Sequence, residues 1–208
     1  FVKKTPLKSF KNMSARGLII ISLTEGDSLG WSRRCLPHEE VLIATKDGFA
    51  CRFGVTDLTS TGRQSRGVRA LNLRENDQMA DMDINTSPAA VASVKNDDDA
   101  YVFVITERGY GKRISIEDFR KAKRGGRGVF AIKFKDKAGG GGKQARAAGK
   151  SGLQADALRC LRFCNSGDEV VLSTSKGTIL RQRVDDVSVQ TRSATGVLVQ
   201  KLAKDDGI

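Results

Sequence analysis

Basic side chains recur in this sequence at positions that suit the binding of a polyanion. Four glycines are each preceded, 13 to 15 residues earlier, by a basic residue, and the pairs are Lys4 and Gly17, Arg52 and Gly67, Arg113 and Gly128, and Arg181 and Gly196. Neighbouring basic residues reinforce this set at Lys3, Lys112 and Arg183. Further basic residues lie closer to the glycines, at Arg16, Arg63, Arg66, Lys123, Arg124, Arg127 and Arg192. We interpret these side chains as phosphate contacts, because repetition places them in one band along the molecule.

Apolar residues share the same spacing and define a unit that occurs four times. The reference glycines, Gly17, Gly67, Gly128 and Gly196, are 50, 61 and 68 residues apart. Three positions after each basic residue stands an aliphatic one, namely Leu7, Val55, Ile116 and Val184. A repeat of this length is typical of propeller-like or solenoid arrays, in which each unit buries its apolar face against the next.

Strand and turn signals account for nearly the whole chain and predict an all-β fold. Turn glycines such as the one in Asp47-Gly48 separate short apolar segments, as in β-hairpins. Strands are expected at residues 2–7, 18–23, 41–45, 49–55, 68–73, 101–106, 129–134, 178–184 and 197–202. No amphipathic stripe is long enough for a helix. We therefore expect four-stranded antiparallel blades arranged around an axis, with about four blades present.

The copies are expected at residues 1–31, 39–84, 100–136 and 167–208 of a single domain. Residues 137–152 contain four consecutive glycines and predict a flexible insertion, because this composition buries too little apolar surface to offset the entropy of ordering. The chain begins without Met at the basic residue of the first copy, and we expect it to be a fragment of a longer protein. In the third copy the expected core is Ile114, Ile116, Phe119, Val129 and Phe134.

The charge balance favours a polyanionic partner. The 208 residues carry 36 Lys and Arg against 24 Asp and Glu, for a formal net charge of +12. Nucleic acid is the leading candidate for such a surface, and an anionic membrane is the second. No apolar run approaches the roughly 18 residues of a membrane span, and no signal segment leads the chain. We therefore expect a soluble domain without a membrane partner.

Other residue types that carry chemistry do not form a recognisable site. The four cysteines lack CxxC spacing and His38 is the single histidine, so neither a disulfide framework nor a metal site is expected. The run Asp97-Asp98-Asp99 is interpreted as a solvated turn. The glycines also have a structural interpretation, since a strand entry can require only their backbone angle, and that alternative stays open. Basic residues on a sheet edge can simply hinder aggregation, but a +12 imbalance and a fixed offset favour phosphate contact.

Three motifs resemble the repeats of a known family. These are residues 2–5 (Val-Lys-Lys-Thr), 109–113 (Gly-Tyr-Gly-Lys-Arg) and 191–197 (Thr-Arg-Ser-Ala-Thr-Gly-Val). In combination they resemble the C-terminal domain of the bacterial-type DNA gyrase A subunit and of its topoisomerase IV counterpart. The resemblance covers the chain except residues 137–152. It implies a β-pinwheel, a propeller-like disc whose basic perimeter wraps duplex DNA so that ATP turnover can introduce supercoils. Family discs usually have five or six blades, and this chain is similar to the last four.

The resemblance also implies partners and a location. The partners would be duplex DNA, the ATPase subunit of an A2B2 holoenzyme, and the N-terminal breakage-reunion domain of the same polypeptide. ATP and Mg would be used elsewhere, with no cofactor in this chain. The location would be the bacterial cytoplasm (nucleoid), or a plastid or mitochondrion for a eukaryotic source. Residues 122–128 resemble the gyrase box, but Ala122 replaces its leading glutamine, and we interpret them as an ordinary inter-strand loop. Tyr101 and Tyr110 lack the arginine that precedes the family's nicking tyrosine, so no catalytic residue is expected.

Three other function classes remain as alternatives. A protein-interaction propeller would present an apolar or mixed-charge face, and a single-stranded RNA binder would present aromatic platforms on the basic face. A small enzyme would need converging acid, base or nucleophile residues, which the sequence does not offer. Bending 20 to 30 base pairs of DNA by 40 to 90° costs roughly 1 to 6 kcal/mol, so the wrapping hypothesis requires several repeated cationic contacts.

Overall fold

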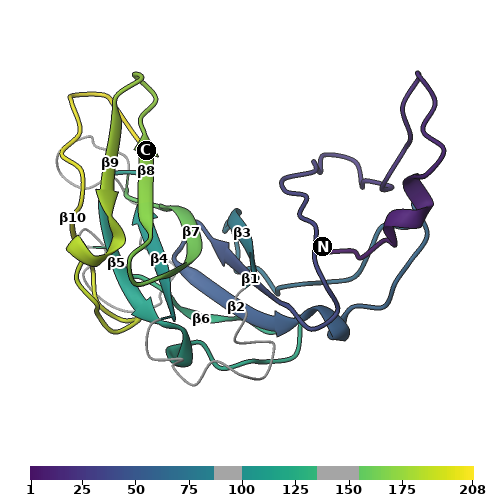
Figure 1. Cartoon of the computed structure of the whole chain (residues 1–208), viewed down its shortest axis with the longest axis horizontal. Helices are drawn as coiled ribbons and strands as arrows, with labels where there is room; N and C mark the ends of the chain where they lie inside the picture. The colour runs from purple at the N-terminus through teal and green to yellow at the C-terminus, as the bar shows by residue number, and fades with distance from the viewer. Residues whose placement is uncertain (87–99, 135–154) are drawn as a thin grey trace.

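The chain forms a curved array of β-sheets in which the four copies follow one another (Figure 1). The computed structural model describes residues 1–86, 100–134 and 155–208. The fourth copy stands at one end of the arc and the first copy, with the N-terminus, at the other. The predicted all-β fold is confirmed, since the only helices in these three segments are short 3-10 turns. The predicted insertion at 137–152 and the run Asp97 to Asp99 lie outside the described residues.

The second and third copies build four-stranded antiparallel sheets around hairpins. The second copy supplies β1 (Glu40–Thr45), β2 (Phe49–Gly54) and β3 (Met79–Asn85), and the third supplies β4 (Ala100–Thr106), β5 (Tyr110–Ser115) and β7 (Leu158–Asn165). The fourth copy forms a two-stranded sheet of β8 (Glu169–Ser173) and β9 (Ile179–Arg183). A 3-10 turn follows each hairpin, namely η2 (Val55–Asp57), η5 (Ile116–Asp118) and η6 (Val184–Asp186). The hairpins β1-β2 and β4-β5 turn at Gly48 and Gly109, which both have positive φ.

The fourth strand of each complete sheet comes from the following copy. β6 (Val129–Phe130) of the third copy pairs with β2, and β10 (Val197–Leu198) of the fourth copy pairs with β5. The strand orders are therefore β3-β1-β2-β6 and β10-β5-β4-β7. In Figure 1, β3 and β7 lie on the concave side of the arc, and β6 and β10 lie on its convex side. The third and fourth copies thus each complete the sheet before them, which links neighbouring copies by main-chain hydrogen bonds.

The concave strands β3 and β7 join the second copy to the third. Asp81 and Asp83 on β3 accept hydrogen bonds from the backbone N–H groups of Leu161 and Phe163 on β7, both at 2.9 Å. Asp81 is buried and also forms an ion pair with Arg162. Carboxylates of one strand thus satisfy the open edge of the other, which would otherwise leave buried donors without acceptors. Neither β3 nor β7 was among the predicted strands.

The strand predictions for the first copy are wrong. Residues 2–7 and 18–23 form no strand, and this copy contains only η1 (Leu7–Phe10) and the isolated bridges from Val2 to Val68 and from Lys4 to Ser60. By spacing from the reference glycine, residues 18–23 correspond to β6 and β10. Those strands pair with the hairpin of the preceding copy, and the 208 residues hold no hairpin before the first copy. Residues 68–73 form no strand for the same reason, because the first copy offers them no hairpin.

The core of the third copy follows the predicted apolar positions with one exception. Ile114, Ile116, Phe119 and Phe134 are buried as predicted. Val129 is 41% exposed, so its placement in the core was wrong. The side chains of β6 alternate in direction, and Phe130 is the one that packs inward, with its ring centroid 4.4 Å from that of Phe49. In the part of the chain that the structure describes, no helix has the length and apolarity needed to cross a membrane.

Candidate nucleic-acid interface

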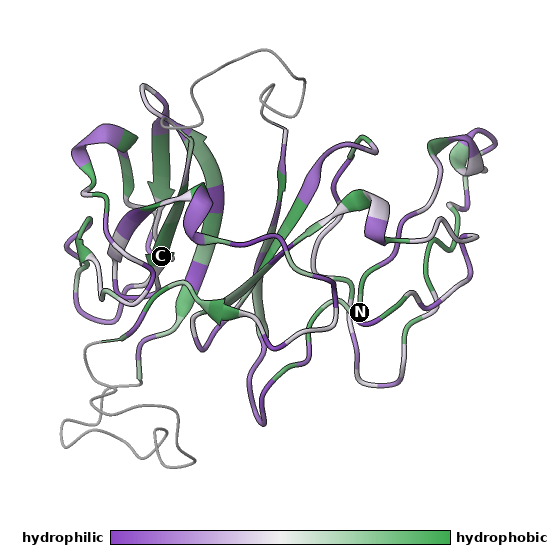
Figure 2. Cartoon of the chain, turned by 90° about the horizontal axis from the view of Figure 1, so that it is seen from below, coloured by the Kyte–Doolittle hydropathy of each residue, from purple (hydrophilic) through white to green (hydrophobic). Residues whose placement is uncertain are grey.

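Three connections run between neighbouring copies and carry six of the fourteen predicted phosphate contacts. They comprise residues 59–67, 120–128 and 188–196, and each leads from a 3-10 turn to a reference glycine. In the view from below, hydrophobic residues are concentrated in strands, and the connections around them carry many hydrophilic residues (Figure 2). These polar segments are the part of each copy that lies outside its own sheet.

Backbone hydrogen bonds seat the connections at equivalent places on successive copies. The N–H five residues after one reference glycine donates to the carbonyl two residues before the next. The three bonds are Ser22 N to Ser65 O at 3.4 Å, Asn72 N to Gly126 O at 2.8 Å and Lys133 N to Ala194 O at 3.2 Å. Because the offsets agree, the same position of each connection recurs at each joint between copies. The fold therefore repeats the basic residues in space as well as in sequence.

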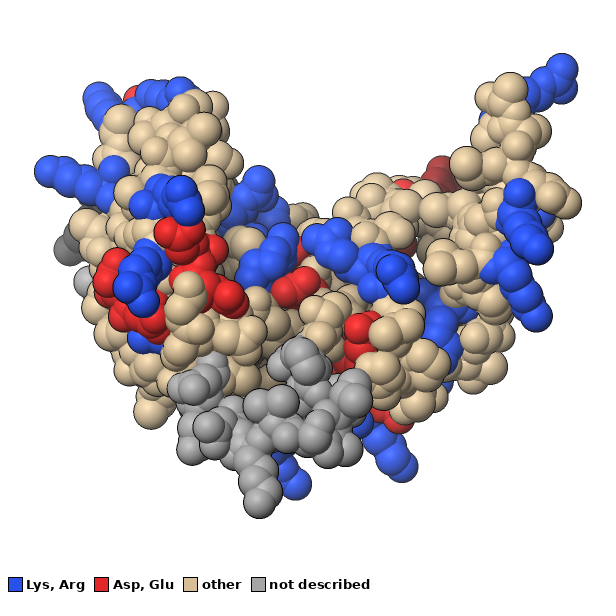
Figure 3. All heavy atoms as spheres, in the orientation of Figure 1, with Lys and Arg blue, Asp and Glu red and all other residues tan. Residues whose placement is uncertain are grey.

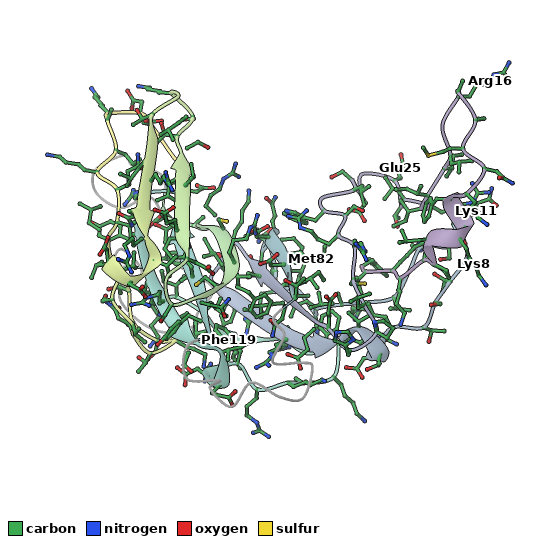
Figure 4. The ribbon with its side chains drawn as sticks, viewed as in Figure 1. Lys8, Lys11, Arg16, Glu25, Met82 and Phe119 are labelled. Atoms are coloured by element: carbon green, nitrogen blue, oxygen red, sulfur yellow. The ribbon has the colours of Figure 1, made fainter. Side chains whose placement is uncertain are left out.

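Two rows of arginines follow from this arrangement. Four residues before the reference glycine stand Arg63, Arg124 and Arg192, and one residue before it stand Arg16, Arg66 and Arg127. Arg124 and Arg192 reach back to the preceding copy, where they donate to the carbonyls of Arg69 (3.4 Å) and Phe130 (3.3 Å). Arg16, Arg66 and Arg127 are exposed, and Figure 4 shows Arg16 at the tip of a loop of the first copy. The second row is thus the more accessible one.

The basic residue at the start of each of the first three units joins two copies. Lys4 donates to the carbonyl of Val55 at 2.9 Å, and Arg52 donates to those of Ile116 (3.0 Å) and Phe119 (3.2 Å). In each case the acceptor belongs to the 3-10 turn of the following copy or to the residue that ends it. Arg52 is also paired with Glu40 at 2.6 Å, and most of both side chains is removed from solvent.

Arg113 is buried in the equivalent position of the third copy. Its guanidinium donates to the carbonyl of Val187 at 2.7 Å and to the carboxylate of Asp185 at 2.7 Å. It also lies 4.8 Å from the ring centroid of Tyr101. This side chain therefore presents little charge to a ligand, contrary to the expectation of a phosphate contact. In the fourth copy, Arg181 is 70% exposed beside Glu169, and Arg183 is 64% exposed near Asp185.

Lys112 and Lys3 donate hydrogen bonds to the backbone carbonyls of the connections. Lys112 has no exposed surface, and its ammonium donates to the carbonyls of Thr191, Arg192 and Ala194 at 2.6, 2.8 and 2.9 Å. Burial, with a smaller contribution from Arg192, lowers the pKa of Lys112 to about 8. Lys3 is half-buried and bonded to the 59–67 connection in the same way. These ammonium groups face protein carbonyls rather than solvent.

The predicted phosphate contacts therefore fall into three sets by exposure. Exposed are Arg16, Arg66, Lys123, Arg124, Arg127, Arg181 and Arg183; half-buried are Lys3, Lys4, Arg52, Arg63 and Arg192; and buried are Lys112 and Arg113. Sequence reasoning missed Arg120, Lys121 and Arg69, which are exposed on or beside the same connections. These three residues could have been found in the sequence, because they lie in the same segments around the reference glycines as the predicted contacts. Figure 3 shows basic side chains along both arms and the middle of the arc, whereas the acidic ones on this face gather mainly at its left.

The reference glycines are required where the chain crosses between sheets. Gly67, Gly128 and Gly196 have φ of +94°, +69° and +79°. A β-carbon on Gly128 would lie 2.6 Å from the carbonyl oxygen of Ala50, and one on Gly196 would lie 2.7 Å from that of Gly111. Both contacts are with the backbone of the preceding copy, so the structural interpretation of these glycines is sufficient.

Metal chemistry finds no support among the described residues, in which no group of three or more His, Cys, Asp or Glu side chains is placed to hold an ion.

Residues 122–128, which resemble the gyrase box, form part of the connection from η5 to β6. They occupy the same place in the third copy as residues 190–196 in the fourth, as the matching backbone bonds show.

The sequence matches the model of one protein family and is similar to named gyrase proteins. The family is described as DNA gyrase C-terminal domain, beta-propeller, and the matched residues are 1–29, 39–85, 100–139 and 168–208. Over its whole length the chain is 38% identical to the DNA gyrase A subunit of Synechocystis sp., of which it covers 25%. It is 31% identical over 97% of its length to a probable chloroplastic/mitochondrial DNA gyrase A subunit of Oryza sativa, of which it covers 21%. The chain thus spans about a quarter or less of these curated relatives.

Solved structures show the same fold. The crystal structure of the C-terminal domain of DNA topoisomerase IV matches 96% of this chain and 54% of that chain, with a TM-score of 0.77 and 24% identity. A structure of the DNA gyrase A C-terminal domain matches 92% of this chain and 56% of that chain, with a TM-score of 0.74 and 24% identity. At this identity the likeness concerns the fold alone, which agrees with the predicted β-pinwheel.

Proposed function

We propose that this chain, which belongs to the family of DNA gyrase C-terminal domains, binds duplex DNA along the edge that carries its connections and bends it around the array. One observation carries the proposal. The connections of successive copies are seated by backbone bonds at identical offsets, and exposed arginines such as Arg66 and Arg127 recur on them. A ligand with evenly repeated negative charge matches such a surface better than a compact anion does.

Seven of the predicted phosphate contacts are exposed. If each neutralises one phosphate, the logarithm of the affinity falls with the logarithm of salt concentration with a slope of about −6. Contacts of this kind fix the position of the duplex and read no base edges, so sequence preference arises from the ease of bending. The buried residues Lys112 and Arg113 are not included in this surface.

Duplex DNA is favoured over single-stranded nucleic acid by the placement of the aromatic residues. Single-strand binders stack bases on exposed aromatic side chains. All 12 aromatic residues belong to the described segments, and of these Phe1 alone is exposed. The surface therefore offers charge along its length and almost no stacking platform.

We further propose that the chain serves a type IIA topoisomerase. Its named relatives are DNA gyrase A subunits. In that setting the wrapped DNA would be presented to the breakage-reunion domain of the same polypeptide, in a holoenzyme that also contains the ATPase subunit. Those parts would use ATP and Mg, and this chain contributes DNA geometry. The bacterial nucleoid is the proposed location, with a plastid or mitochondrion for a eukaryotic source.

A topological assay tests the proposal. A nicked plasmid is incubated with the chain and sealed with ligase, and the linking number is read after deproteinisation. We expect a shift that grows with protein concentration and disappears at high salt. An unchanged linking number together with salt-insensitive duplex binding would refute DNA wrapping.

A pair of charge variants tests the position of the surface. Replacing Arg66 and Arg127 by glutamine removes two charges from the accessible row, and the salt slope is expected to become shallower by about 2. Replacing Lys201 and Lys204 by glutamine removes the same charge from exposed positions outside the connections. If the two double variants lose affinity equally, net charge rather than the connections governs binding.

A further inference from the structure

The buried ammonium of Lys112 has no free hydrogen-bonding capacity. A lysine ammonium has three N–H donors, and Lys112 makes three bonds to carbonyls of one connection, at Thr191, Arg192 and Ala194. These acceptors are 79 to 82 residues away in the chain and belong to the following copy. Lys112 therefore fixes the shape of the connection from the sheet beneath it.

Lys3 repeats this contact at another joint. Its ammonium donates to the carbonyls of Gly62 at 2.8 Å and Ser65 at 3.2 Å and to that of Arg63, and within its own copy it also contacts the carbonyl of Ile20 at 2.7 Å. Gly62, Arg63 and Ser65 stand five, four and two residues before Gly67, and the acceptors of Lys112 stand at the same offsets before Gly196. Two copies thus place one ammonium under the same three carbonyls. The recurrence indicates a device of the repeat rather than an accident of one loop.

The joint between the second and third copies lacks this device. The position equivalent to Lys112, one residue before Arg52, is the buried Cys51. Exposure of the connection arginine changes accordingly. Arg63 and Arg192, above Lys3 and Lys112, are half-buried, whereas Arg124, above Cys51, is exposed. The lysine therefore coincides with a half-buried arginine on the connection above it.

We propose that Lys112 is a positioning residue that sets the height of the 188–196 connection, and with it the place of Arg192 in the row that faces DNA. Lys3 acts in the same way on the 59–67 connection and Arg63. The inference rests on the proposed DNA binding for its functional consequence, but the holding of the connection is a property of the free protein. DNA would then follow a path whose distance from the array differs between the joints that have the lysine and the joint at Arg124 that lacks it.

Graded substitution tests the inference. Lys112→Gln keeps two N–H donors and Lys112→Met keeps none at similar length. Amide hydrogen exchange is measured on the whole chain without DNA, over residues 190–196 and over β8 and β9. We expect exchange of the connection to be faster by about tenfold in Lys112→Met, as for the loss of a charge-assisted hydrogen bond, and less so in Lys112→Gln. The amides of β8 and β9 are expected to keep their protection, which also shows that the variant is folded.

The DNA arm uses the same variants in the ligation assay, with Lys201→Gln as the charge-matched control. Because Lys112 touches no DNA, the linking-number shift is expected to change in Lys112→Met while duplex affinity falls no more than in the control. Unchanged exchange of residues 190–196 would overturn the inference, and so would a loosened connection with an unaltered linking-number shift. Lys3→Met repeats the exchange measurement on residues 59–67 and decides the question if Lys112→Met fails to fold. If the wild-type chain leaves the linking number unchanged, the proposed function fails, and the exchange result still decides whether Lys112 holds the connection.

Discussion

Gly128→Ala is expected to be more destabilising than the same change at any reference glycine that contacts no preceding sheet. Gly128 has φ of +69°, and an added β-carbon would lie 2.6 Å from the carbonyl oxygen and 3.1 Å from the carbonyl carbon of Ala50. Both atoms belong to the backbone of β2, so no side chain can rotate away. Gly17 is the matched control, since its φ is +77° and nothing lies within 4 Å of the position that an added β-carbon would take there.

The magnitude follows from two terms. Holding alanine in the left-handed region costs roughly 1 to 2 kcal/mol at either position. At Gly128 the chain must also move away from β2, which weakens the bonds that Ala131 and Ile132 donate to the carbonyl of Gly48, at 2.8 and 3.3 Å. Each such bond is worth about 0.5 to 1.5 kcal/mol net. The expected loss of unfolding free energy is therefore about 2 to 5 kcal/mol for Gly128→Ala and about 1 to 2 kcal/mol for Gly17→Ala.

Urea denaturation of both variants, followed by circular dichroism and by hydrogen exchange of residues 129–132, measures the difference. The exchange data assign the loss to β6 rather than to a distant part of the chain. Equal destabilisation by the two substitutions would show that the backbone angle alone requires glycine at this position. The close approach of neighbouring copies would then not explain the recurrence of the reference glycine.

Three further outcomes are expected. Asp81→Ala removes the acceptor of the Leu161 N–H and the ion-pair partner of Arg162. It should lower the free energy of unfolding, measured by urea denaturation, by about 2 to 3 kcal/mol. The control Asp186→Ala, at an exposed position, should be near neutral. Burial lowers the pKa of Lys112 from 10.5 to about 8, so the unfolded chain binds more protons than the folded chain between these pH values. The free energy of unfolding of wild type, measured relative to Lys112→Met, should therefore rise with pH across this window by at most about 3 kcal/mol. A fall would contradict the burial of this ammonium. Burial raises the pKa of the Cys160 and Cys164 thiols to about 12. At pH 8 a disulfide reagent should therefore modify these thiols only as fast as the chain opens, and rapid labelling of the native chain would argue against this packing.

Much of the fold was predictable because its signals are local. Hairpins at Asp47-Gly48 and the apolar positions Ile116 and Phe119 depend on turn chemistry and on spacing within one copy, and the structure confirms them. Val129 was misplaced because its face depends on which strand β6 joins, and β6 joins a sheet of another copy. β7 was missed because its partner β4 lies more than 50 residues earlier, across the residues 135–154 that the structure does not describe.

The candidate interface divides in the same way. The sequence by itself determined the repeat, the net charge of +12 and the recurrence of basic residues at fixed offsets, since these need only residue types and distances along the chain. It could not separate Arg127, which is exposed, from Lys112, which is buried, because both are basic residues of one copy. That separation was decided by the exchange of strands between copies. Each connection crosses to the preceding copy, so a basic residue beneath the connection donates to its carbonyls, and a basic residue on the connection, such as Arg127, faces solvent.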